Sequence, residues 1–253
     1  MGFPFVLLLT ALLARAETGD LTFKIPVVKT SVNLEGQPID LAIWGTVSSR
    51  NAAAGVFQLA MTADLAGLQE NLIAVLGAQL NQSEKCGNRL TVDRAVLTPA
   101  APIADLTAYV HYERYACVKA LGKEIVKRLV GGNGVVEVNL SPQLDAGQIG
   151  LAAHVVKIDA DGSLGDVLRS GSFGDSVREK IRTTIERAIR KSANLKSVLP
   201  PEMGNVATIQ SLQFADGGAG KLWLTINAEV RVAEEQLRAV AKSAAWLPAR
   251  ASN

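Results

Sequence analysis

The chain has 253 residues, a formal net charge of +2 and an apolar content of 48%. This length accommodates one large domain or two small ones, and the apolar fraction is sufficient for a sizeable core. The nearly balanced charge argues against nucleic acid as a main partner.

The N-terminus predicts export. Residues 5–13 read FVLLLTALL, an apolar run too short to span a bilayer, and Ala14 and Ala16 supply the small residues that a signal peptidase requires. We expect residues 1–16 to be a signal peptide, although no Lys or Arg precedes the apolar run. A buried N-terminal element is the alternative. The remaining chain is then expected to be a soluble periplasmic or secreted protein, because no later apolar run approaches the length of a membrane helix.

Three strands, at residues 21–27, 39–48 and 55–63, are predicted to precede a helix at residues 64–81 that Asp64 caps. The apolar stripe of this helix includes Leu68, Leu72, Val75 and Leu76, whereas Gln69, Glu70 and Gln79 are expected to face away. Gly67 and Gly77 each weaken the helix by nearly 1 kcal/mol unless another segment packs closely against them.

The two cysteines are predicted to close a long hairpin. Residues 89–98 and 105–118 both look extended, and a turn centred between Ala101 and Pro102 pairs Thr98 with Asp105. The same register places Cys86 opposite Cys117, and an exported chain permits a disulfide. Closing a loop of about 32 residues stabilises the fold by roughly 3–4 kcal/mol in the chain-entropy model.

Further along, residues 123–130 are ambiguous between helix and strand, and residues 131–134 read as a flexible turn. Strands are expected at 135–140, 149–158, 207–214 and 221–232. On the last of these, Leu222, Leu224 and Ile226 share one face. A short helix at 233–242 precedes a flexible C-terminal tail, residues 246–253, so that residues 17–245 form a single domain.

A second long helix is predicted between residues 171 and 201. Ser176 and Glu179 form a capping box at its start, and Pro200 and Pro201 prevent its continuation. Its apolar stripe includes Ile181, Ile185 and Ile189, and its opposite face is rich in Arg and Lys. That basic face could make a transient contact with an anionic membrane surface, but an ordinary solvated face is the favoured interpretation because Glu is interspersed.

Long strands on both sides of each helix favour antiparallel meanders over βαβ crossovers. We therefore expect an α+β fold in which long amphipathic helices pack in a curved antiparallel β-sheet. No catalytic motif is recognisable, and neither His111 nor His154 has further ligands at a metal-binding spacing. The sequence predicts no enzymatic activity, no metal and no cofactor.

The layout of residues 20–243 resembles the tubular lipid-binding superfamily, the family of the bactericidal/permeability-increasing protein. The resemblance lies in Leu199-Pro200 at the end of a helix, the AEVRV sequence at 228–232 and the EEQL segment at 234–237. It implies a long helix wrapped by a curved sheet, with an apolar groove for lipid tails.

The first functional hypothesis is a binding protein that holds an apolar or lipid-like ligand between helix and curved sheet. Its expected lining comprises Leu68, Leu72, Val75, Leu76, Ile181, Ile185, Ile189, Leu222, Leu224 and Ile226. The same residues would form a closed core if no groove exists. The alternative is an envelope structural or interaction protein that binds a protein partner through its sheet surface, with Trp44, Trp223 and Tyr109 as anchors.

Overall fold

The computed structural model describes residues 22–34, 36–51, 55–80, 86–120, 123–145, 148–162, 165–166, 175, 179, 207–243 and 247–248. The elements in this part of the chain are β1 Thr22–Leu34, β2 Gln37–Asn51, β3 Val56–Asp64, α1 Ala66–Leu80, β4 Gly87–Ala100, β5 Ile103–Ala120, β6 Lys123–Asp145, β7 Gln148–Ala160, β8 Ala207–Asp216, β9 Leu222–Arg231, α4 Glu234–Ser243 and β10 Leu247–Pro248.

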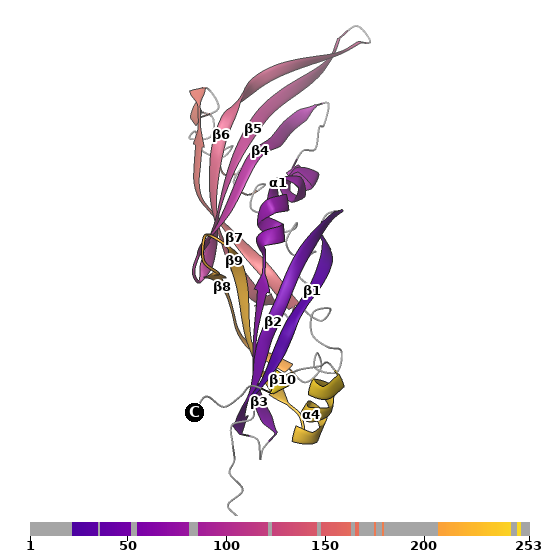
Figure 1. Cartoon of the computed structure of the whole chain (residues 1–253). Helices are drawn as coiled ribbons and strands as arrows, with labels where there is room; N and C mark the ends of the chain where they lie inside the picture. Colours follow the sequence, from indigo (N-terminus) through magenta and orange to yellow (C-terminus); the bar gives the residue numbers. More distant parts are fainter. Residues whose placement is uncertain are drawn as a thin grey trace, which may run out of the picture.

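The strands form two antiparallel sheets. A six-stranded sheet has the order β10-β1-β2-β3-β9-β8, and a four-stranded sheet has the order β4-β5-β6-β7. Figure 1 shows an elongated molecule in which the two sheets follow one another along the long axis, with α1 near their junction. A backbone hydrogen bond joins the two sheets at this junction, from Phe214 N in β8 to Pro102 O (3.0 Å) in the β4–β5 turn.

The expected α+β fold is wrong. Within the described residues the chain is mostly strand, with two helices, α1 and α4, and the single curved sheet is replaced by two sheets. The predicted helix at 171–201 lies outside the described residues except for Asp175 and Glu179. The expectation of long amphipathic helices packed in one sheet therefore does not describe this architecture.

Strand β6 explains part of the error. The sequence divides residues 123–140 into an ambiguous element, a glycine-rich turn and a short strand, but the structure forms one strand of 23 residues. It pairs with β5 from Ala104↔Leu140 to Ala120↔Lys123, and the glycine-rich run lies opposite Val110, Tyr112 and their neighbours. Pairing along the whole of β5 therefore overrides the turn preference of the glycines.

The disulfide between Cys86 and Cys117 is confirmed. The turn and the pair Thr98↔Asp105 are also as predicted, but the register shifts by one residue between Val92 and Arg94. A bulge at Asp93 accounts for the shift, because one strand gains a residue that the other lacks. Cys86 and Cys117 are consequently offset from direct opposition, with Cα atoms 5.6 Å apart.

The apolar residues gather in one main core for each sheet. In the four-stranded sheet the core includes Leu97, Leu106 and Val138, and α1 contributes Leu72 and Leu76 to it. In the six-stranded sheet the core is centred on Val47, Phe57, Leu59 and Val230, and Leu237 of α4 closes it. Helix α4 therefore covers part of the six-stranded sheet, and α1 packs against the four-stranded one.

The predicted signal peptide and the predicted single domain both remain untested. The signal peptide at residues 1–16 lies outside the described residues, and the single-domain assignment of residues 17–245 stays a prediction. Among the described segments, no helix combines the length and the hydropathy needed to cross a membrane. The disulfide indicates an oxidising, extracytoplasmic location.

Candidate functional site

Helix α1 supplies four of the predicted lining residues, and it lies between the two sheets. Leu72 and Leu76 are buried against the four-stranded sheet, whereas Val75 is buried with Leu34 and Ile39 at the β1–β2 turn. Leu68 is partly buried and packs against both groups. The stripe read from the sequence is thus divided between two contact surfaces.

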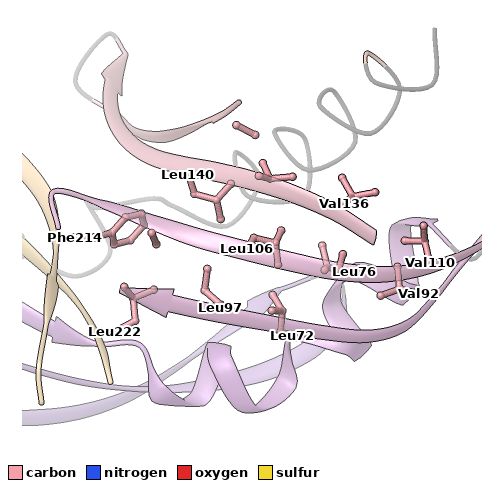
Figure 2. Packing of buried hydrophobic residues seen from close by; sticks show 14 residues of the cluster. Leu72, Leu76, Val92, Leu97, Leu106, Val110, Val136, Leu140, Phe214 and Leu222 are labelled. Carbon is pink, nitrogen blue, oxygen red and sulfur yellow. The ribbon is translucent and has the colours of Figure 1, made fainter. Parts of the chain in front are cut away.

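Strand β9 supplies three more, and its alternation is confirmed. Leu222 is fully buried in the core of the four-stranded sheet, while Ile226 is buried in that of the six-stranded sheet. Leu224, between them, is partly buried and packs against both cores. The inner face of β9 therefore runs from one core into the other, and Figure 2 shows Leu222 beside Phe214 at the end of the first.

The remaining three lining residues, Ile181, Ile185 and Ile189, lie outside the described residues. The structure brings Leu72, Leu76 and Leu222 together in one core, and leaves Val75 and Ile226 in others. In the described part of the chain these side chains are buried or partly buried. Their role as ligand contacts stays a prediction.

Gln69 is a residue whose role the sequence did not reveal. Its side-chain Nε2 donates to the backbone oxygens of Leu97 (2.8 Å) in β4 and Gly220 (2.9 Å), and its Oε1 accepts from Leu222 N (2.9 Å). The expectation that Gln69 faces away from the packed side is therefore wrong. One amide links α1 to a strand of each sheet, and only the three-dimensional arrangement places those backbone groups within its reach.

Two further contacts fix the start of α1. Asp64 Oδ1 accepts a hydrogen bond from Ala66 N at 2.9 Å, which is the predicted N-terminal cap. A Cβ atom at Gly67 would overlap the backbone oxygen of Asp40 in β2. Only a residue without a Cβ atom allows α1 to approach β2 this closely. The lower helix propensity of glycine at position 67 is therefore accompanied by close packing between α1 and β2.

The most distinctive apolar surface is one face of β5. Alternate residues on this face are Ala104, Leu106, Ala108, Val110 and Tyr112, and the structure buries all five to between 0% and 7% exposure. Figure 2 shows Leu106 and Val110 on this strand, packed between Leu97 and Val92 of β4 and Leu140 and Val136 of β6. The same face continues through Arg114 and Ala116 to Val118, which is 58% exposed.

Tyr112 is itself buried, but the apolar side chains around it retain accessible area. Leu90 and Val130, from the neighbouring strands β4 and β6, and Ile158, from β7 beyond β6, pack against Tyr112, and each is partly buried. Burial raises the pKa of the Tyr112 phenol, against a smaller lowering by Arg114. Burial therefore favours the neutral phenol.

The opposite face of β5 carries a polar network. Glu113 accepts a hydrogen bond from the Tyr115 hydroxyl at 3.0 Å, and its Oε1 lies 3.2 Å from Arg128 Nε and 3.6 Å from His111 Nε2. The hydrogen bond from Tyr115, together with Arg128 and His111, lowers the pKa of Glu113. Because His111 Nδ1 also lies 2.7 Å from Asn133 Oδ1, both ring nitrogens have protein neighbours.

A cluster of potential metal ligands occurs at Cys86, Cys117 and Glu124. Because the two cysteines form the disulfide, neither sulfur is a thiolate that could bind a metal. This cluster therefore offers one carboxylate, and it does not form a metal site.

The aromatic anchors of the alternative hypothesis do not form one surface. The rings of Trp44 and Trp223 pack edge to face, with centroids 5.2 Å apart, and a Cβ at Gly217 would overlap the Trp223 ring. Trp223 Nε1 is buried without a hydrogen-bond partner within the described part of the chain. Tyr109, on the other sheet, is 39% exposed beneath Arg94, whose guanidinium lies 5.2 Å from the ring centroid.

No family model matches this chain, and no curated protein matches it. One solved structure to which it is similar is a crystal structure of lipopolysaccharide binding protein, with a TM-score of 0.39 and 10% identity. The match covers 70% of this chain and 33% of that protein, so the chain spans about a third of its length. This is a weak structural resemblance, and it assigns neither a family nor a ligand to this chain.

Proposed function

We propose that this chain is an extracytoplasmic binding protein that holds a lipid-like apolar ligand against the apolar face of the four-stranded sheet. The observation that supports this proposal is the gradient of burial along one face of β5. Exposure is 0% at Ala104, 1% at Leu106 and 58% at Val118. Beyond its cover this face carries the exposed Arg114 and then the apolar Ala116 and Val118, so apolar surface continues past the covered stretch.

The ligand would lie over the partly covered stretch. There Leu90, Val130 and Ile158 surround Tyr112 and retain accessible area, so an acyl chain could remove apolar surface from water without displacing packed side chains. Each Å² removed contributes about 25 cal/mol. Of the predicted lining, Leu72, Leu76 and Leu222 would form the closed end of the same face.

The proposal includes the compartment and the type of protein. The disulfide supports an oxidising location, and a periplasmic or secreted protein with the predicted signal peptide fits it. We propose a binding role without an enzymatic one, and without a cofactor, because the residues on the apolar face provide no nucleophile with an adjacent base.

A titration with a fluorescent fatty acid tests the function and its place. Val130→Thr and Ile158→Thr keep branched side chains and remove apolar area from the proposed site, so together they should weaken binding about tenfold. Val156→Thr is the matched control on β7, since Val156 is 53% exposed and lies outside the group around Tyr112. Absence of saturable binding by the parent, with no lipid in an organic extract of the purified protein, would contradict the proposal.

A further inference from the structure

The β5–β6 hairpin ends in an apolar ribbon that the core does not cover. We use the name hairpin tip for residues 116–120 of β5 and 123–129 of β6. The exposed fractions of Val118, Ile125, Val126 and Leu129 are 58%, 54%, 36% and 57%. These residues are four of the ten exposed large apolar side chains in the described structure. Figure 1 shows this end of the hairpin projecting beyond the rest of the molecule.

The pairing pattern explains the exposure. Strand β4 begins at Gly87, opposite Tyr115, and β7 reaches only as far as the pair Gly134↔Ala160. Beyond these points β5 and β6 pair with each other alone among the described strands. Val118 lies opposite Ile125 on one face of the ribbon, and Cys117 lies opposite Val126 on the other. Both faces of the tip therefore present apolar side chains to solvent.

A two-stranded ribbon is marginally stable by itself, so this one needs support at its base. The disulfide from Cys86 to Cys117 ties β5 to the residue that precedes β4. Arg128 adds an ion pair with Glu113, 3.2 Å away. The apolar side chains are thus held outward on a braced support, which agrees with a surface that binds a partner rather than with an incomplete core.

The charges around the tip identify the partner. Lys119, Lys127 and Arg128 are exposed among the apolar side chains, and Glu124 is the one acidic side chain described with them. Two copies of the chain meeting tip to tip would bring these cations together, which is unfavourable. An anionic lipid surface accepts both features, since apolar side chains enter the interface and cations remain at the headgroups.

We propose that the hairpin tip docks this protein on anionic lipid bilayers. Val118, Ile125, Val126 and Leu129 enter the interfacial region, and Lys119 and Lys127 contact the lipid phosphates. This site differs from the basic face expected at residues 171–201, and docking goes beyond the proposed holding of a ligand.

The test is co-sedimentation of the full chain with two kinds of vesicle, one of phosphatidylglycerol mixed with phosphatidylcholine and one of phosphatidylcholine alone. The chain should sediment with the anionic vesicles more than with the neutral ones, and this preference should fall as salt rises, because exposed charges are screened. Failure of the parent protein to bind anionic vesicles would overturn the proposal.

Apolar variants locate the contact. Val118→Thr combined with Ile125→Thr keeps branched side chains, which strands favour, and should lower vesicle binding on the order of tenfold. The matched control is Val27→Thr with Val28→Thr in β1, where the parent side chains are 62% and 51% exposed. Equal losses in the two double variants, or no loss in the tip variant, would refute the placement.

Cation variants provide the second arm. Lys119→Gln with Lys127→Gln should weaken binding about fivefold per lysine, whereas Lys24→Gln with Lys29→Gln, both exposed in β1, should leave it unchanged. Fatty-acid binding by Lys119→Gln with Lys127→Gln should match the parent, so that failure of docking and failure of the proposed function are distinguished. If sedimentation velocity shows a parent dimer that the tip variants convert to monomer, without vesicle binding, the tip is a contact between copies and the proposal is wrong.

Discussion

Replacing Gln69 tests whether α1 joins the two sheets. Gln69→Ala removes three hydrogen bonds, two that Nε2 donates to Leu97 O and Gly220 O and one that Oε1 accepts from Leu222 N. Each such bond contributes about 0.5–1.5 kcal/mol net, and the loss leaves the amide of the fully buried Leu222 without its partner. We expect the free energy of unfolding to fall by about 2–4 kcal/mol.

The assay is urea unfolding with the disulfide intact, and Glu70→Ala is the control because Glu70 is the exposed neighbour in the same helix. That control should change stability by no more than about 0.5 kcal/mol. Gln69→Glu sharpens the test. This variant keeps the acceptor for Leu222 N but places a carboxylate against two carbonyl oxygens. Its loss of unfolding free energy relative to the parent should therefore be larger at neutral pH than in acid, where the protonated carboxyl can donate a hydrogen bond. Equal stability of Gln69→Ala and Glu70→Ala would refute the linking role.

Three further predictions concern stability. Peptide mapping without reductant should show Cys86 linked to Cys117, and reduction should lower the free energy of unfolding by roughly 3–4 kcal/mol; free thiols in the exported protein would contradict the pairing. Gly67→Ala should lower the melting temperature, although Ala is the better helix former, because its Cβ would overlap Asp40 O; a higher melting temperature would show that α1 does not approach β2 so closely. Because the pKa of Glu113 is lowered in the folded state, its stabilising contribution is present above the unfolded pKa and is lost as pH falls through the folded pKa. Glu113→Gln should therefore be less stable than the parent at neutral pH and equal to it in acid, and a pH-independent difference would contradict this.

Local patterns predicted the elements that have one buried face. The alternation on β9 follows directly from residues that point in turn to the core and to solvent. The β4–β5 turn and the pair Thr98↔Asp105 follow from turn chemistry at Ala101 and Pro102. In α1, the capping aspartate is a local signal that the structure confirms, whereas the sequence left open whether another segment packs against Gly67, which the structure shows for Asp40.

Features that depend on distant pairing could not be predicted. The six-stranded sheet forms because β3 pairs with β9, with Leu59 opposite Ala228, and no local pattern specifies that partner. The length of β6 is set by β5, which overrides the preference of Gly131 and its neighbours for a turn. The role of Gln69 depends on backbone groups of two other strands, β4 and β9. The helical pattern therefore placed this polar residue on the solvent side, although its amide is bonded between the strands.

The candidate site shows the same division. Apolar residues such as Leu72 and Leu222 were identified as inward-facing, and they are buried. The exposed continuation of the β5 face at Val118 was not identified, because exposure depends on where the neighbouring strands end. The sequence of a strand shows which residues are apolar. Whether neighbouring strands bury those residues depends on the arrangement of the whole sheet.

The most direct test of the central claim is photo-crosslinking with a fatty acid that carries a diazirine on its acyl chain, followed by mass mapping of the labelled peptides. Labels are expected on the apolar face of the four-stranded sheet, at Leu90, Val130, Ile158 and their neighbours, and excess unlabelled fatty acid should suppress the labelling. Labels confined to the six-stranded sheet, or labelling that excess ligand does not reduce, would contradict it.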